Sequence, residues 1–217
     1  MVAEQLERWQ IIDKNFTNRV SSHDLPSLLS QPGIINKTDF INLFTCQIIT
    51  RHIDLQSRIL KQKNLSFYTI ASAGHENNIA LSYVFNLQDM ALLHYRSSAF
   101  MLNRAYKYKG DKGLEHQVIE QLKSLVAAKT DQISSGRHKV FGSIELNVPP
   151  QTSTIASHLP KAVGIALSIN QNKILKNKTA KLKDNSVVLC SFGDAGFNHS
   201  MLRISAFYYG TPHLHSI

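Results

Sequence analysis

The chain is poor in cysteine, with only Cys46 and Cys190 among its 217 residues. Both stand in apolar surroundings, so no disulfide framework is indicated, and we expect two reduced core thiols of an intracellular protein. No apolar run approaches the roughly 20 residues that a membrane-spanning helix needs. The first ten residues carry Glu4, Glu7 and Arg8 with no apolar stretch behind them, which is not the pattern of a signal peptide. We therefore expect a cytoplasmic protein with no membrane segment.

Acidic residues are also scarce, since 15 Asp and Glu stand against 24 Lys and Arg, giving a formal net charge of +9 and an isoelectric point near 9.6. Such an excess can indicate nucleic-acid binding. Much of it is local, because five lysines crowd between Lys173 and Lys183. This run contains no aromatic side chain on which a base could stack. We interpret it as a solvated helix end and loop, and nucleic acid is not the partner that we expect.

The 217 residues are enough for one large α/β domain, or for one domain with a helical extension, and a hydrophobic content of 43% allows a packed core. The pattern predicts an N-terminal helix over 2–16 and a linker over 20–37, which contains Pro26, Pro32 and Gly33. The main domain would then span 38–217. It would open with a helix from Phe40 to Lys61, capped by Thr38-Asp39.

Short apolar runs in the main domain predict strands, and 3.6-residue periodicity predicts helices between them. This alternation favours an α/β fold, with a parallel sheet flanked by helices. The segment 130–152 is predicted to form a long, ordered loop. The predicted extended segments are 67–70, 90–95 and 187–192, and the predicted helices begin near residue 74 and cover 97–108, 111–128 and 153–170.

The most informative stretch of this domain is Ser186–Ser200, with the sequence SVVLCSFGDAGFNHS. Its apolar first half predicts a fully buried strand. The chain then turns at Gly193-Asp194-Ala195-Gly196. Ligands of open parallel sheets bind at the carboxyl ends of strands, and an Asp there can hold a cation that in turn holds a diphosphate. The alternative is an ordinary turn with a solvated Asp.

Two further segments carry candidate functional residues. His94-Tyr95-Arg96 follows a predicted strand, and a guanidinium there can grip phosphate oxygens with two parallel hydrogen bonds. The alternative for Arg96 is a surface salt bridge. His138, in the predicted loop, is the one candidate that we single out for a catalytic role, because a histidine titrates near neutral pH. Its alternative is a structural or solvent-exposed histidine.

The predicted helix over 153–170 begins with Ser153 as its cap. Small residues keep this helix slim, as close packing against a sheet requires. Pro160 stands inside the pattern, so it either kinks the helix or marks its true first turn.

Together these segments resemble the alpha-type portion of the thiamine-diphosphate-dependent component of 2-oxo acid dehydrogenase complexes. The resemblance is closest to the bacterial form in which alpha and beta portions are fused in one chain, and it covers about residues 40–212. It implies a thiamine-diphosphate-binding, transketolase-like fold. The blocks that carry it are FYTIASAGHE (67–76), LLHYRS (92–97), GRHKVFG (136–142), QTSTIASHLP (151–160) and FGDAGFNHS (192–200).

The resemblance also implies roles for individual residues. Arg96 would bind the cofactor diphosphate with Tyr95 beside it, and Ile155 would wedge the cofactor into its bent shape. Asp194 would be a magnesium ligand, and the metal would bridge the diphosphate oxygens. The remaining implied residues are Ser153, Gly193 and Ala195 at the cofactor and Phe67 near the substrate pocket. Thr152, Ser157 and His158 fall where some relatives hold potassium, but the histidine replaces an oxygen donor, so potassium is not predicted.

The implied partners are a beta-type portion or subunit, a lipoyl-bearing acyltransferase and a 2-oxo acid, in an oligomer. No Asn follows Gly210, where the family motif places its second metal ligand, so the domain is expected to be incomplete at the C-terminus. We expect a fragment that does not catalyse alone and whose bare sheet edge favours self-association. Two alternatives are an inactive truncated remnant and a basic nucleic-acid-binding protein.

Overall fold

The computed structural model describes residues 6–23, 35–176 and 182–209. The chain forms two compact units, Met1–Asn36 and Lys37–Ile217. All residues predicted for the site belong to the second unit. None of the helices in the described ranges is long and apolar enough to cross a membrane.

The first unit contains the helix α1 (Arg8–Ser21), which has no buried residue. The predicted helix over 2–16 therefore lies too early in the chain. The start is fixed by a capping box, in which the Glu7 backbone N–H donates to the Gln10 side chain at 2.7 Å. Most of the predicted linker, residues 24–34, lies outside the described residues.

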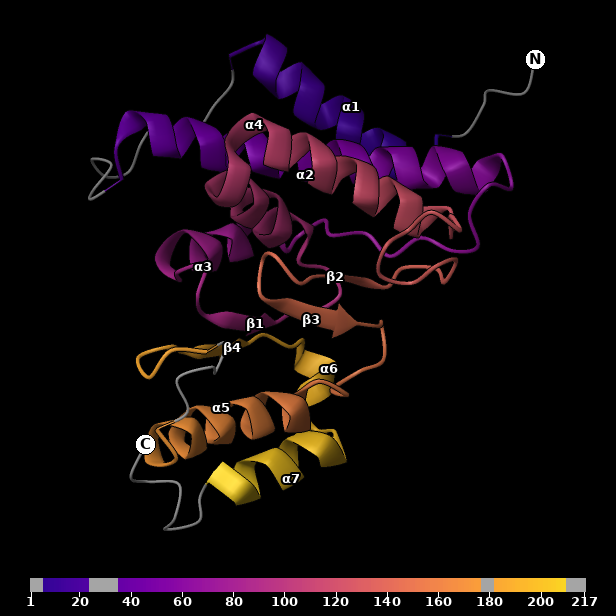
Figure 1. Ribbon diagram of the computed structural model, residues 1–217. Coiled ribbons are helices and arrows are strands. Elements are labelled where there is room, and N and C mark those ends of the chain that lie inside the picture. The colour runs from indigo at the N-terminus through magenta and orange to yellow at the C-terminus, as the bar shows by residue number, and fades with distance from the viewer. Residues whose placement is uncertain (1–5, 24–34, 177–181, 210–217) are drawn as a thin grey trace, which may run out of the picture. The chain divides into compact units, whose positions relative to one another are not determined.

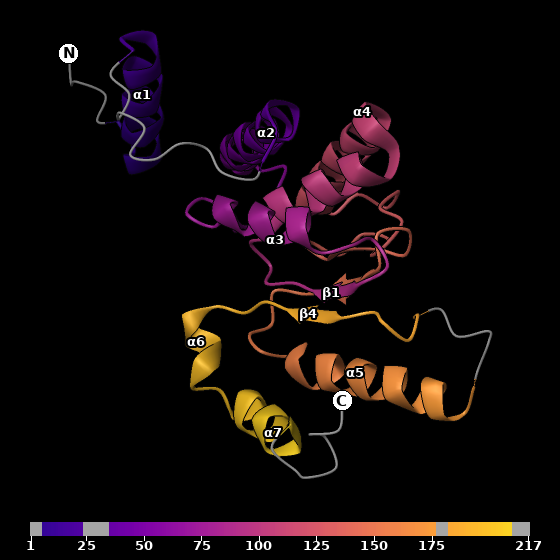
Figure 2. The ribbon, with the colours of Figure 1, turned by 90° about the vertical axis from the view of Figure 1, so that its left-hand side faces the viewer.

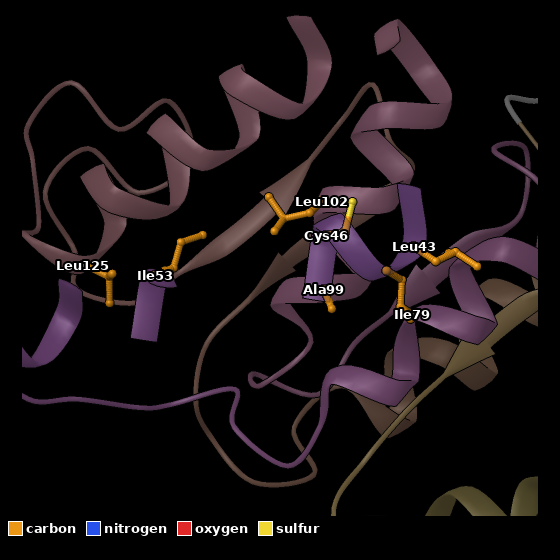
Figure 3. Packing of buried hydrophobic residues seen from close by; sticks show 7 residues of the cluster. All are labelled: Leu43, Cys46, Ile53, Ile79, Ala99, Leu102 and Leu125. Atoms are coloured by element: carbon orange, nitrogen blue, oxygen red, sulfur yellow. The ribbon is translucent and has the colours of Figure 1, made fainter. Parts of the chain in front are cut away.

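Two long helices, α2 (Lys37–Gln62) and α4 (Ser98–Leu125), pack against each other in the second unit. The predicted helix over 40–61 is confirmed, and two of its apolar residues, Phe40 and Phe44, are about half exposed. The buried apolar cluster of this region consists of Leu43, Cys46, Ile53, Ile79, Ala99, Leu102 and Leu125 (Figure 3).

The predicted cap of α2 is wrong, because Thr38 and Asp39 already stand in its first turn. Asp39 instead accepts a hydrogen bond from the Tyr83 hydroxyl at 2.9 Å. Tyr83 belongs to the short helix α3 (Ile79–Val84), which follows the 3-10 turn η1 (Glu76–Asn78). The bond therefore connects the start of α2 to α3.

Helix α4 is broken near its middle, where Lys109 and Gly110 leave the helical conformation. Gly110 has a φ of 59°, a value that suits glycine. The break separates the two helices predicted over 97–108 and 111–128, so the sequence located this interruption correctly.

The strands β1 (Met90–Leu92) and β4 (Val188–Cys190) pair in parallel. Asp89, just before β1, accepts the backbone N–H of Val187, just before β4, at 2.9 Å. The same carboxylate accepts the Asn86 N–H at 2.8 Å. One buried side chain therefore holds the starts of both strands in register.

The predicted loop over 130–152 contains a β-hairpin that the sequence did not indicate. Its strands, β2 (Phe141–Ser143) and β3 (Val148–Gln151), pair antiparallel with an irregular register. Between them, the Asn147 carbonyl accepts the backbone N–H of Ala91 at 3.0 Å, so the hairpin joins the open side of β1.

Helices cover both faces of the β1–β4 pair, as Figures 1 and 2 show: α2, α3 and α4 lie on one side, and α5 (Leu159–Ile174) and α7 (Ser200–Tyr209) on the other. This arrangement is compatible with the predicted α/β class. Helix α5 starts six residues after Ser153, the predicted cap, and Pro160 lies in its first turn. The prediction of a fully buried β4 is wrong, since all three of its residues are half-buried.

Candidate functional site

A pocket of about 170 Å³ lies where the chain leaves β1 and β4. Three separate segments supply most of its lining: the exit of β1, the connection from β3 to α5, and the exit of β4 with the short helix α6 (Asp194–Phe197). His75, just before η1, also lines it. Six of the eight residues predicted for cofactor and substrate binding line it together. They are Tyr95, Arg96, Ile155, Gly193, Asp194 and Ala195.

Arg96 contributes the permanent positive charge of this pocket. Its guanidinium donates a hydrogen bond to the Ala71 carbonyl and lies 5.5 Å from the centre of the Tyr95 ring. Within the described residues, no carboxylate forms an ion pair with Arg96, so the predicted alternative of a surface salt bridge is not observed. The charge is available to an anion in the pocket.

The acceptor of that bond belongs to a segment that is itself held firmly. The buried Asp54 of α2 accepts the backbone N–H groups of Ser72 at 2.9 Å and Ala73 at 2.8 Å. Burial raises the pKa of this carboxyl above its ordinary range. Arg96 is thereby attached to the packed helical region through the segment that follows Ala71.

One wall of the pocket is the segment that carries Arg96, and the Gly193-Asp194 turn at the exit of β4 forms a second wall. Gly193 caps α6 in an extended conformation, and Asp194 opens the helix with its side chain exposed. A Cβ atom on Gly193 would lie 3.0 Å from Nε2 of His94, so a side chain there would crowd the imidazole. Glycine at this position allows the two strand exits to approach each other closely.

His94 fills the space between these walls. Its ring stacks on His75 with centroids 5.2 Å apart and tilts against Tyr95 at 4.0 Å. Burial, followed by the charges of His75 and Arg96, lowers the pKa of His94 to about 4. The imidazole is therefore neutral at physiological pH and adds no positive charge to the pocket.

The third segment, residues 152–158, contributes Ile155, whose side chain is 44% exposed and lines the pocket. Ser153 is not among the lining residues. Its hydroxyl lies 3.4 Å from that of Tyr68, at the edge of the site. The structure thus brings Ile155 to the pocket and leaves Ser153 beside it.

Phe67 and His138 lie together outside the pocket. Phe67 is 72% exposed and meets the His138 ring edge-on, with centroids 5.6 Å apart. Nε2 of His138 is 3.2 Å from the Ser66 hydroxyl, and burial lowers the pKa of the imidazole. The proposed substrate residue and the proposed catalytic residue are therefore neighbours, and neither lines the pocket.

Sequence reasoning assigned no role to three residues that support the site: His94, Gln151 and Ser191. The last of these stands directly after β4, whereas the sequence placed it inside the predicted strand over 187–192. His158 was noticed as an unusual residue, and its partners could not be foreseen. Nε2 of His158 lies 2.8 Å from the Ser191 carbonyl, and Nδ1 lies 3.1 Å from the Gln151 amide.

The donor set of the pocket suits a diphosphate with a bound magnesium ion. Its lining includes one cationic guanidinium and one carboxylate, and oxygen ligands are those that Mg²⁺ prefers. In the described part of the chain, no group of three or more His, Cys, Asp and Glu side chains could hold a metal ion. Asp194 is the carboxylate of the pocket lining that could hold a metal ion.

Searches for related proteins give two relatives. The chain is 28% identical over 152 residues to 2-oxoisovalerate dehydrogenase subunit alpha 2, mitochondrial, of Arabidopsis thaliana, which covers 67% of the chain and 28% of that protein. It is 24% identical over 148 residues to 2-oxoisovalerate dehydrogenase subunit alpha, mitochondrial, of Caenorhabditis elegans. That match covers 65% of the chain and 30% of the relative. The chain spans less than a third of each relative. No protein-family model matches it.

These similarities support a relationship to the alpha subunits of 2-oxo acid dehydrogenases, in agreement with the resemblance read from the sequence blocks. They do not distinguish the fused bacterial form from the separate alpha subunit. Both relatives are named as mitochondrial proteins, whereas the sequence predicted a cytoplasmic one.

Proposed function

We propose that residues 38–217 bind the magnesium diphosphate end of thiamine diphosphate, as the alpha-type portion of a 2-oxo acid dehydrogenase with a transketolase-like fold. One observation carries the proposal. Three segments that are distant in the sequence converge on one pocket, and they deliver six of the residues assigned to this cofactor. The similarity to 2-oxoisovalerate dehydrogenase alpha subunits supports the same assignment.

The residues of the chain bind and orient the cofactor in this proposal. Arg96 neutralises diphosphate charge, and Tyr95 packs beside the guanidinium. Gly193 and Ala195 let the backbone come close to the ligand, because neither carries a bulky side chain. Ile155 presents an apolar surface to the thiazolium part. When bound, the cofactor supplies the stabilised carbanion on which decarboxylation of a 2-oxo acid depends.

Asp194 holds the magnesium ion. The carboxylate is exposed and opens the helix α6, so it can turn toward an ion at the strand exits. A lone carboxylate binds Mg²⁺ weakly in water, and the diphosphate is therefore an obligatory part of the metal site. Metal and cofactor should bind together.

The whole reaction requires more than this chain. A beta-type portion or subunit supplies the rest of the active site, and a lipoyl-bearing acyltransferase receives the acyl group. The substrate is a 2-oxo acid, and the names of the two relatives favour a branched one. Phe67 and His138, which contact each other outside the pocket, are the residues that we assign to the substrate and to catalysis.

Calorimetric titration of the chain with thiamine diphosphate tests the proposal. Binding should require Mg²⁺, and Asp194→Asn should lower the affinity at least about tenfold, which corresponds to about 1.4 kcal/mol. Glu145→Gln is the matched control, since this exposed carboxylate pairs with Lys109 away from the pocket. Equal affinity of the two variants, or binding without Mg²⁺, would refute the metal role. Salt-sensitive retention of DNA or RNA without any cofactor binding would favour the nucleic-acid alternative.

A further inference from the structure

Ser191 connects the two strand exits that form the pocket. Its backbone N–H donates to the Leu92 carbonyl at the end of β1 at 2.9 Å. Its hydroxyl oxygen accepts the backbone N–H of His94 at 2.9 Å. Tyr95 and Arg96 directly follow that histidine, and Gly193 comes two residues after the serine. Ser191 therefore touches both walls of the proposed diphosphate site through its own bonds.

His158 connects Ser191 to the third segment of the pocket. A carbonyl oxygen only accepts hydrogen bonds, so Nε2 of His158 carries the proton and donates to Ser191 at 2.8 Å. Nδ1 then accepts from the side-chain amide of Gln151 at 3.1 Å. The side chains of His158 and Gln151 are both buried, at 2% and 3% exposed. Each ring nitrogen has one fixed partner, which sets the tautomer and the orientation of the ring.

The packing around β4 explains why these polar contacts matter. The strand pairs with β1 over only three residues, and all three of its own residues are half-buried. A groove of about 430 Å³ opens between α5, β4 and α7. Apolar packing on this side is therefore sparse, and the position of the β4 exit depends on directional bonds. Removing one partner also leaves a carbonyl or amide without a hydrogen bond in a water-poor place.

We propose that His158 and Ser191 are positioning residues, which fix the Gly193-Asp194 turn relative to Tyr95 and Arg96. They act through the backbone, and the reacting atoms of a ligand need not touch them. The inference extends the proposed diphosphate site, but the geometry that it explains exists in the ligand-free chain. It can therefore be tested without the cofactor.

The first test compares two substitutions of His158 in the full ligand-free chain. Gln places an amide near the position of Nε2 and can still donate to Ser191, whereas Asn is too short and reaches only the position of Nδ1. The readout is amide hydrogen exchange of Gly196, whose N–H donates to the Gly193 carbonyl at 2.9 Å. We expect exchange about tenfold faster in His158→Asn and within about twofold of the wild type in His158→Gln.

A core variant separates positioning from general stability. Ile53→Val, in the helical core, should lower the melting temperature without changing the exchange of Gly196. If His158→Asn leaves this exchange unchanged, or if Ile53→Val accelerates it equally, the inference is overturned. Ser191→Ala and Ser191→Thr form a second pair, since only threonine keeps the hydroxyl oxygen that accepts the His94 N–H. The alanine variant should expose that amide to exchange, and the threonine variant should protect it.

The cofactor titration then distinguishes this inference from the proposed function. If the wild type binds thiamine diphosphate, His158→Asn should lower the affinity about tenfold, and His158→Gln should restore it to within about twofold. If the wild type binds no cofactor, the proposed function fails, and the exchange experiment still decides whether the two residues position the turn. Normal affinity in His158→Asn together with normal exchange would refute the positioning role.

Discussion

Helices flank both faces of the β1–β4 pair (Figure 2), but the two faces differ in how they are packed. On the side of α2, α3 and α4, the apolar cluster is nearly inaccessible to solvent, and Cys46 and Leu102 are 1% and 0% exposed. On the side of α5 and α7, the strand is half-buried beside a groove of about 430 Å³. One face is a closed core, and the other is open.

The candidate pocket lies between these two regions and takes one wall from each. Arg96 is attached to the closed core through Ala71 and the segment that Asp54 holds. Asp194 stands on the open side, where polar contacts rather than close packing fix the backbone. The difference teaches that one wall is preorganised, and that a ligand bridging both walls would stabilise mainly the second.

The largest contrast should come from the same truncation made in each region. Leu102→Ala removes a fully buried side chain and should cost about 3 kcal/mol of unfolding free energy, because the core cannot collapse around the cavity. Leu202→Ala removes a partly exposed side chain at the groove and should cost about 1 kcal/mol or less. Urea denaturation of both variants measures the difference. Equal losses would mean that the groove is closed in solution.

Substituting alanine for two helical glycines should change the stability of the chain in opposite directions. A Cβ on Gly113 of α4 would lie 2.2 Å from the Ala105 carbonyl oxygen, so Gly113→Ala should destabilise the chain by about 2 kcal/mol. Gly164 of α5 has no atom within 4 Å of such a Cβ, and Gly164→Ala should stabilise it by about 0.5–1 kcal/mol through helix propensity. Melting temperatures should shift down and up, respectively. A lower melting temperature for Gly164→Ala would show that something covers α5.

The smallest expected effect is a change in the pH dependence of stability, and it comes from His138. Burial lowers the pKa of His138 below its ordinary 6.5, so the unfolded chain binds a proton more readily than the folded one. Stability from this group is complete above the unfolded pKa and is lost as the pH falls below it. His138→Gln cannot titrate, so its melting temperature should fall less than that of the wild type between about pH 7 and pH 5. Parallel curves would exclude this contribution.

The sequence predicted those elements whose residues carry a local signal. Helix α2 follows from apolar periodicity, and the break in α4 follows from Gly110, since a positive φ suits glycine. The hairpin was missed because its strands are three and four residues long and Pro149-Pro150 argues against a strand. These prolines are tolerated where the pairing is short and irregular.

The site divides in the same way. Tyr95, Arg96 and Asp194 were recognisable because they directly follow apolar runs and belong to recurring sequence blocks. The bond from His158 to Ser191 joins residues 33 positions apart, and it depends on the register of β4 and on where α5 begins. Ser153 suggested a cap too early, so the path of residues 153–158 could not be derived. Long-range geometry of this kind leaves no periodic trace in a sequence.

The bond from Asp89 to Val187 has a consequence for how the pocket is assembled in time. It closes a loop of 98 residues, and the parallel pairing of β1 with β4 closes the same loop. Helices α2 and α4 can associate while that loop is still open, but the two walls of the pocket meet only after it closes. Non-local closure of this kind is slow compared with helix formation. During synthesis, the helical region would therefore collapse first, and the ability to capture a ligand would arise as one of the last events of folding.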